Sequence, residues 1–302
     1  MNTLTFIGGN QKEITATLWL PETQPNYILQ IVHGMTEHIG RYHNFAKELN
    51  TYGIGVVGFD LRGHGHNDSL PQIASFKEDG WQASLEDIHA CKQAIIKQYP
   101  NTPIYILGFS LGSFLVREYL SLYPENIAGA IIAGTGKQPK AILSIIKALV
   151  KKEIQKNGFN QTTPLVKKLS FETYNQKFKP NRTEADWLCY DKQELDNYLN
   201  DPLCRKYISS GLFYQLLDSM QKTGENNIYI NYPNIPYLLL SGEKDAVGDF
   251  TKGILQVQKD MEKHQLQVET HLLPNARHDI FHEIDTETTK KVIQIIHHWI
   301  KK

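Results

Sequence analysis

The residue whose surroundings most clearly predict chemistry is Ser110, the centre of the run Gly-Phe-Ser-Leu-Gly over 108–112. Glycines on both sides allow a tight turn between a strand and a helix, which holds the serine strained with its hydroxyl exposed. The same letters would fit a turn whose serine only caps a helix, so the context decides. The apolar run 103–107 predicts a buried strand, and apolar positions spaced from Leu111 onward predict a helix. The sequence therefore predicts a nucleophilic serine.

A nucleophilic serine needs a base and an acid, and two later loops supply candidates. Polar groups that follow parallel strands meet at the same edge of a sheet. Asp245 follows the predicted strand 235–240, and His278 follows the predicted strand 267–272. Ser, Asp and His in this chain order form the triad of many serine hydrolases. We expect His278 to take the proton of Ser110 while Asp245 orients the imidazole.

Three other acidic residues compete for these roles or assist them. Asp249 and Asp279 lie close to the same loops, but Asp245 follows its strand after a short loop, as the triad template requires. We expect Asp249 to cap the helix predicted over 251–264. Glu283 either supports the histidine loop or is a solvated side chain.

An acyl-transfer site also needs N–H donors for the developing oxyanion. One expected donor is the backbone N–H of Leu111, directly after the nucleophile. The other is the backbone N–H of Met35, which lies in the loop after the predicted strand 27–32. The two side chains have no part in this role, so their bulk is free to line an acyl pocket.

Composition excludes several classes of partner. The 302 residues carry 32 Lys and Arg against 32 Asp and Glu, so no nucleic-acid partner is expected. The first ten residues lack the apolar stretch of a secretory signal, and no apolar run approaches about 18 residues. The three cysteines, Cys91, Cys189 and Cys204, are widely spaced and favour reduced thiols over a disulfide framework. We predict a cytoplasmic protein and leave peripheral membrane contact open.

Strand and helix patterns alternate through most of the chain. This alternation predicts an α/β fold with a mostly parallel sheet flanked by helices. The alternation stops over 137–232, where helical and aromatic-rich segments occur without a convincing strand. A segment of this length should carry structure of its own rather than form a loop. We predict a core made of 1–136 and 233–302, with a helical cap inserted between them.

Five ordered motifs resemble those of monoacylglycerol lipases and bacterial lysophospholipases, which belong to the α/β-hydrolase superfamily. The motifs are His-Gly-Met-Thr-Glu-His-Ile-Gly-Arg-Tyr at 33–42, Asp-Leu-Arg-Gly-His-Gly at 60–65, the serine turn at 108–113, Gly-Glu-Lys-Asp at 242–245 and Arg-His at 277–278. The resemblance implies an α/β-hydrolase fold, no cofactor, and hydrolysis of single-chain acyl esters such as monoacylglycerols or lysolipids. Phe109 and Leu111 replace the histidine and methionine that are usual in the serine turn, which affects the shape of the pocket rather than the chemistry.

Apolar residues in the predicted cap repeat at helical spacing beside lysines. The apolar stripe comprises Ile142, Ile145, Ile146, Leu149 and Val150, and the lysines are Lys147, Lys151, Lys152 and Lys156. A basic amphipathic helix can lie on a lipid surface, but an ordinary surface helix that packs on a core shows the same stripe. The sequence leaves both interpretations open, and the resemblance to lipid-cleaving enzymes favours a membrane-facing lid.

Three rival interpretations stand beside this one. A zinc hydrolase would use the H-x-H-x-D spacing at 64–68, with further ligands from His33, His38 and His43. Ser69 stands where that motif has its next histidine, and a Gly-His-Gly turn needs no metal, so we expect no metal site. The fold could also serve a binding module without catalysis. Finally, the same triad could cleave esters, thioesters or amides of small non-lipid substrates.

Overall fold

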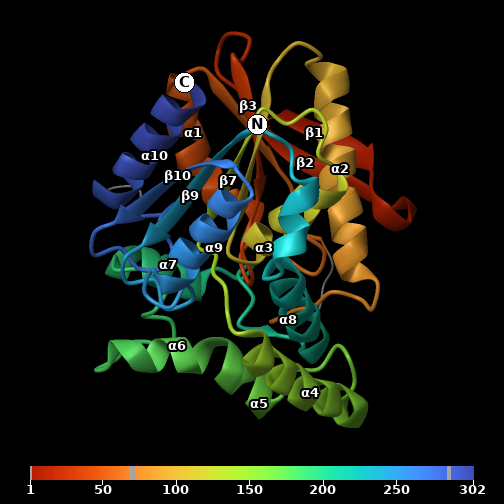
Figure 1. Cartoon of the computed structure of the whole chain (residues 1–302), viewed down its shortest axis with the longest axis vertical. Helices are drawn as coiled ribbons and strands as arrows, with labels where there is room; N and C mark the ends of the chain where they lie inside the picture. The colour runs from red at the N-terminus through yellow and green to blue at the C-terminus, as the bar shows by residue number, and fades with distance from the viewer. Residues whose placement is uncertain (1, 68–71, 284–286) are drawn as a thin grey trace.

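The computed structural model describes residues 2–67, 72–283 and 287–302. Within these residues an eight-stranded sheet forms the centre of the molecule, in the order β1-β2-β4-β3-β6-β7-β9-β10 (Figure 1). β1 pairs with β2 and β2 with β4 in antiparallel fashion, and the other neighbouring strands are parallel. The strands are β1 (Asn2–Ile7), β2 (Glu13–Trp19), β3 (Tyr27–Val32), β4 (Ile54–Gly58), β6 (Ile104–Phe109), β7 (Gly129–Ala133), β9 (Pro236–Gly242) and β10 (Gln267–Leu273). The predicted α/β fold with a mostly parallel sheet is confirmed.

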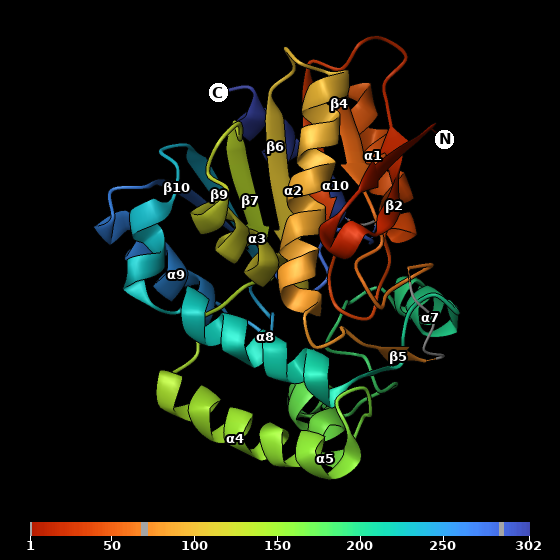
Figure 2. The same cartoon turned by 90° about the vertical axis from the view of Figure 1, so that its right-hand side faces the viewer.

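Helices cover both faces of the sheet. The central strands β4, β6 and β7 are therefore buried along their whole length. α1 (His43–Thr51) and α10 (Glu287–Ile300) pack on one face. α2 (Gly80–Gln98), α3 (Leu111–Leu122) and α9 (Lys252–Lys263) pack on the other, and Figure 2 shows α2 and α3 in front of the strands. Apolar spacing in the sequence predicts the last helix, α10, over 286–300, and its predicted first residue, Thr286, lies outside the described residues.

The segment 137–232, the predicted cap and called the cap below, lies at one end of the molecule, opposite the two ends of the chain (Figure 1). The helices of this segment are α4 (Lys140–Asn157), α5 (Pro164–Lys167), α6 (Thr173–Asn175), α7 (Lys192–Asn200) and α8 (Ser210–Thr223). α4 runs alongside α8, and α8 packs on α3 (Figure 2). Short helical turns complete the described chain: η1 (Gly9–Gln11), η2 (Ile39–Tyr42), η3 (Lys168–Glu172), η4 (Gln176–Phe178) and η5 (Asn226–Asn231).

The structure contains strands that the sequence did not predict. β1 adds an edge strand to the sheet, and β5 (Ile73–Ala74) pairs in parallel with β8 (Tyr207–Ile208). The expectation that 137–232 holds no strand therefore needs correction. A strand of two residues shows no periodicity, so no sequence pattern could have announced it.

Arg117 on α3 ties both ends of this segment to the core. Its side chain is fully buried and donates to the carbonyl oxygen of Gly136 at 3.2 Å and to that of Thr223 at 2.5 Å. Two hydroxyls, Thr135 Oγ1 at 3.3 Å and Tyr229 Oη at 3.1 Å, accept its remaining hydrogen bonds. The helix that begins at the predicted nucleophile thus also fixes the two places where the chain leaves the sheet and returns.

Candidate active site

Ser110 stands on a strained turn between β6 and α3. Its backbone has φ 51° and ψ −116°, a left-handed conformation that non-glycine residues rarely adopt. The flanking glycines make the turn possible: a Cβ on Gly108 would lie 2.4 Å from the carbonyl oxygen of Gly112, and a Cβ on Gly112 would lie 2.0 Å from that of Val32. The turn therefore has the geometry expected of a nucleophile elbow.

The structure brings Ser110, His278 and Asp245 together from three separate loops. His278 Nε2 lies 2.9 Å from Ser110 Oγ, and His278 Nδ1 lies 2.9 Å from Asp245 Oδ2. The imidazole and the carboxylate are both buried. Asp245 Oδ1 accepts the backbone N–H of Val247 at 2.8 Å, so its second oxygen is free to face the imidazole. In this arrangement Nδ1–H donates to the carboxylate, and Nε2 accepts the serine hydroxyl proton.

The competing acids have other partners. Asp279 accepts hydrogen bonds from Arg41 at 3.0 Å and His282 at 2.8 Å. Burial alone would raise the pKa of Asp279, but the charges of His282 and Arg41 lower it well below its usual value. Glu283 is buried rather than solvated and accepts the backbone N–H of Tyr190 at 2.6 Å, so it joins the histidine loop to the cap.

The prediction that Asp249 caps α9 is wrong. The cap position of α9 is Thr251, and no side chain caps it. Residues 249–251 all have positive φ, at 49°, 51° and 81°, whereas a capping residue is usually extended. The Asp249 carboxylate instead lies 3.8 Å from Lys177 and 3.7 Å from Lys252.

The loop after β3, which contains Met35, is shaped by a buried carboxylate. Glu37 Oε1 accepts the backbone N–H of Gly34 at 2.5 Å and the hydroxyl of Tyr42 at 3.0 Å. Glu37 Oε2 accepts from Arg41 at 2.6 Å. Leu111, the other expected oxyanion donor, is the first residue of α3, where backbone N–H groups lack partners within the helix. The two expected donors therefore lie at the ends of neighbouring strands, β3 and β6.

Two histidines of the zinc hypothesis accept hydrogen bonds within the protein. His33 Nε2 accepts the backbone N–H of Leu61 at 2.9 Å, and His43 Nδ1 accepts from Trp19 at 3.0 Å. His64 is fully buried, which lowers its pKa to about 3. The motif's Asp68 and Ser69 lie outside the described residues.

Two aromatic rings enclose the imidazole of His278. Phe109 lies on one side with a centroid distance of 4.9 Å, and Trp187 from the cap lies at 5.3 Å. Tyr174 packs on Trp187 at 5.5 Å, and burial together with the charge of Asp245 raises the pKa of this tyrosine to about 12. The serine-turn motif predicted an effect of Phe109 on pocket shape alone, and the sequence signal for Trp187 was limited to the aromatic content of the predicted cap.

Trp187 also forms a wall of a cavity inside the cap. The cavity has a volume of about 290 Å³. Its lining includes apolar and aromatic side chains, Phe171, Leu188, Tyr198, Leu199 and Tyr207, and charged ones, Lys167, Glu172, Glu184, Arg205 and Lys206. Tyr198 reaches back to the loop after β3, where its hydroxyl lies 2.8 Å from Thr36 Oγ1. Two side chains of the cavity lining therefore reach the site: Trp187 contacts the histidine, and Tyr198 contacts the expected oxyanion loop.

Known proteins resemble this chain in sequence or in structure. A monoglyceride lipase of Mus musculus is 25% identical over 287 residues, covering 93% of this chain and 84% of the relative. A monoacylglycerol lipase of Mycolicibacterium smegmatis is 23% identical over 300 residues, covering 98% and 95%. The crystal structure of a carboxyl esterase from Bacillus coagulans in complex with glycerol superposes with a TM-score of 0.86 at 23% identity, covering 99% and 98%.

The family model for serine aminopeptidases, S33, matches residues 23–285, a span that includes the serine turn, both triad loops and the cap. That span is most of the chain, and the superposed structure has the same fold over its whole length. The chain therefore belongs to the serine aminopeptidase S33 family of α/β-hydrolases.

Proposed function

We propose that this protein is a serine hydrolase that cleaves carboxylic esters of single-chain acyl lipids through an acyl-enzyme. The observation that carries the proposal is the continuous contact from Ser110 Oγ to His278 to Asp245, with 2.9 Å at each step. His278 removes the serine proton as Ser110 attacks the ester carbonyl, and the backbone N–H groups of Met35 and Leu111 stabilise the oxyanion. His278 then protonates the leaving alcohol and activates the water that releases the acid.

The substrate class rests on two further observations. The cavity beside Trp187 is lined largely by apolar and aromatic groups, which suit an acyl chain. The relatives that match nearly the whole chain are named monoglyceride or monoacylglycerol lipases. We infer that the cap formed by 137–232 holds the acyl chain while the ester carbonyl meets Ser110. The alternative is a small non-lipid ester, thioester or peptide, which the same three side chains could cleave.

A direct test compares substrates that differ in one property at a time. Turnover would be measured on p-nitrophenyl esters of increasing chain length, a monoacylglycerol, lysophosphatidylcholine and an aminoacyl p-nitroanilide. We expect hydrolysis of the longer esters and monoacyl lipids, little of the anilide, and a loss of about 10⁴-fold or more in Ser110→Ala. Preferred cleavage of the anilide would overturn the lipid assignment. Failure of Ser110 to react with a fluorophosphonate probe would overturn the triad.

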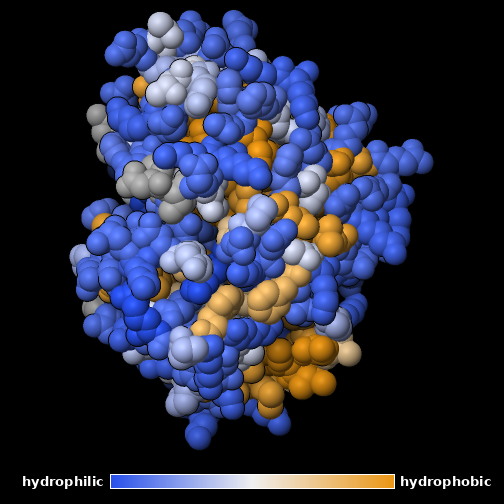
Figure 3. Space-filling view, turned by 90° about the vertical axis from the view of Figure 1, so that its left-hand side faces the viewer, coloured by the Kyte–Doolittle hydropathy of each residue, from blue (hydrophilic) through white to orange (hydrophobic). Residues whose placement is uncertain are grey.

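Contact of the cap with a membrane surface is part of the proposal. The expected stripe on α4 divides in the structure: Val150 is buried, whereas Ile142, Ile145 and Leu149 are 50%, 64% and 41% exposed. Figure 3 shows a strongly hydrophobic patch at the lower right of the molecule, where α4 lies. Lys152 and Lys156 are exposed further along the same helix, so an apolar surface is followed by a basic one.

Vesicle flotation tests this contact. Ile145→Glu should weaken binding to vesicles that contain anionic lipid, because it places a charge in the apolar patch. Gln155→Glu is a matched control, since it adds the same charge at an exposed position of α4 outside the patch. Equal flotation of both variants and the parent protein would contradict the lid.

Among the described helices none is long and apolar enough to cross a bilayer. A cytoplasmic location remains a prediction.

A further inference from the structure

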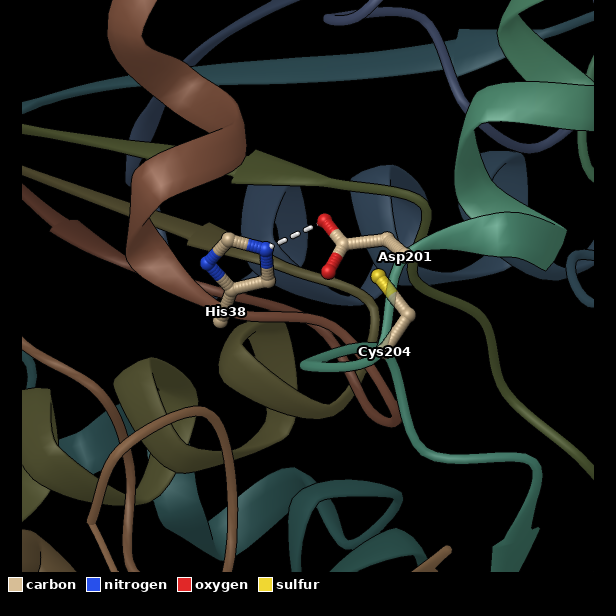
Figure 4. Close-up of side chains that lie close together, drawn as sticks. All are labelled: His38, Asp201 and Cys204. Carbon is tan, nitrogen blue, oxygen red and sulfur yellow. Dashed lines mark hydrogen bonds and ion pairs between the residues drawn. The ribbon is translucent and has the colours of Figure 1, made fainter.

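Three side chains with metal-binding atoms converge where the loop after β3 meets the cap. His38 Nε2 lies 2.8 Å from Asp201 Oδ2, and the donor atoms of His38, Asp201 and Cys204 all lie within 4.8 Å of one another (Figure 4). His38 follows Met35 by three residues, whereas Asp201 and Cys204 follow α7. The cluster therefore joins the expected oxyanion loop to the cap, and it shares no residue with the proposed triad.

The cap part of the cluster is held in place by its own backbone. Residues 201–204, Asp-Pro-Leu-Cys, form a turn in which the N–H of Cys204 donates to the carbonyl of Asp201 at 3.1 Å. Proline at the second position fixes the backbone of such a turn. One oxygen of the Asp201 carboxylate accepts a backbone N–H inside the turn at 2.8 Å, which leaves the other for the imidazole. The N–H of Arg205 donates to the carbonyl of Thr36 at 2.9 Å and fixes the turn against the loop after β3.

The charges around the cluster favour a cation. Arg41 forms ion pairs with Glu37, Glu194 and Asp279, so its single positive charge lies beside three negative charges. The carboxylate of Asp201 adds a fourth negative charge. Arg205, next to Cys204, donates to backbone carbonyls, one of them that of Gly65 at 2.6 Å, and adds a second positive charge. The four carboxylates still outnumber the two guanidinium groups. Cys204 lines the cavity beside Trp187, which gives a small ion a route from solvent.

We propose that His38 Nε2, an Asp201 carboxylate oxygen and Cys204 Sγ form a binding site for Zn²⁺, with water from the cavity as the fourth ligand. Zinc accepts nitrogen, oxygen and sulfur in tetrahedral geometry, and its bond lengths set donor atoms about 3.5 Å apart. The donor atoms of His38, Asp201 and Cys204 lie between 2.8 Å and 4.8 Å from one another. Shifts of about 1 Å would therefore bring them to the separation that zinc requires.

Binding of the ion requires a defined proton balance. The Cys204 thiol loses its proton to solvent and becomes the thiolate ligand. The His38 imidazole keeps one proton, which moves from Nε2 to Nδ1 so that Nε2 can bind the metal. Asp201 gives up the hydrogen bond from His38 and binds the metal as a carboxylate. No oxidant or reductant takes part.

The test is direct titration of the metal-stripped full chain with ZnCl₂, followed by calorimetry and by thermal melting. We expect saturable binding of one ion and a rise in melting temperature. Cys204→Ser and Asp201→Asn should each weaken binding at least about tenfold, since even loss of an outer-shell partner has that effect. Cys189→Ser is the matched control, because it removes a buried cap thiol outside the cluster and should bind like the parent. Co²⁺ in place of zinc should give a thiolate-to-metal absorption band that Cys204→Ser lacks.

Three results would overturn the site: no saturable zinc binding by the parent protein, equal binding by the parent and both ligand variants, or a cobalt spectrum without a thiolate band. Equal binding by the variants would assign the zinc to surface histidines or to His278. All these measurements are independent of hydrolysis, so they remain decisive if the proposed substrate class proves wrong.

Discussion

Replacing Trp187 by leucine should slow the chemical step of this enzyme rather than only weaken substrate binding. The Trp187 ring lies 5.3 Å from the imidazole of His278, which in the proposed mechanism becomes positively charged during attack by Ser110. An aromatic contact is worth about 0.5–1.5 kcal/mol beyond its buried area, and a desolvated cation over an aromatic face about 2 kcal/mol. Loss of about 1–2 kcal/mol in the transition state lowers kcat roughly 5- to 30-fold.

The assay is steady-state hydrolysis of a short p-nitrophenyl ester, because a short acyl chain depends least on the cavity. Trp187→Phe keeps a ring against the imidazole and should retain kcat within about threefold. Phe171→Leu is the matched control, because Phe171 stacks on the Trp187 ring at 5.8 Å and leaves the contact between Trp187 and the imidazole in place. This variant should keep kcat near the parent value. A Trp187→Leu variant with normal kcat and a raised KM would refute the reasoning and make Trp187 only a wall of the acyl cavity.

Three further predictions concern the acid of the triad, the buried arginine and a buried histidine. Asp245→Asn should lower kcat by about 10⁴-fold in the same ester assay while the melting temperature stays close to that of the parent, because the amide favours the wrong imidazole tautomer. Arg117→Met should lower the free energy of unfolding by about 3 kcal/mol in a urea titration, since it leaves the carbonyls of Gly136 and Thr223 buried without donors. An unchanged urea midpoint would contradict a stabilising role of Arg117 at these two carbonyls. The pKa of His64 is about 3 when folded and near 6.5 when unfolded, so the unfolded chain binds the proton first and stability falls as pH drops from about 6.5 towards 3. His64→Leu should flatten that decline in a series of urea titrations across this pH window, and an unchanged slope would refute the assignment.

Local sequence predicted the strained serine turn because one of its causes is local. The Cβ clash at Gly108 is with the carbonyl oxygen of Gly112 in the same motif, so neighbouring residues contain this part of the reason. The clash at Gly112 is with the carbonyl oxygen of Val32 on the adjacent strand β3, which only the folded sheet brings close. The loops of Asp245 and His278 were predicted from the rule that parallel strands end at one edge, and the structure brings both side chains to Ser110. Their catalytic roles remain a proposal.

Contacts between distant segments could not be predicted from single elements. Trp187 and His278 are 91 positions apart in the chain, and only the folded cap defines their contact. The error at Asp249 has a related origin, because residues 249–251 all have positive φ, which residues such as Phe250 and Thr251 rarely adopt and which their types therefore did not predict. β8 was missed because its two residues form a strand only through pairing with β5.

The anchoring of both chain crossings on Arg117 has a consequence for how this enzyme can change. Arg117 binds the chain both where it leaves the sheet, near Gly136, and where it returns, near Thr223. The two ends of the intervening helical segment therefore keep fixed positions. The composition of this segment can drift, and with it the preferred substrate, while the strand-to-helix junction that presents the hydroxyl of Ser110 stays where it is. Residues of the segment that contact the histidine, such as Trp187, are the exception, because a change there also affects the reaction.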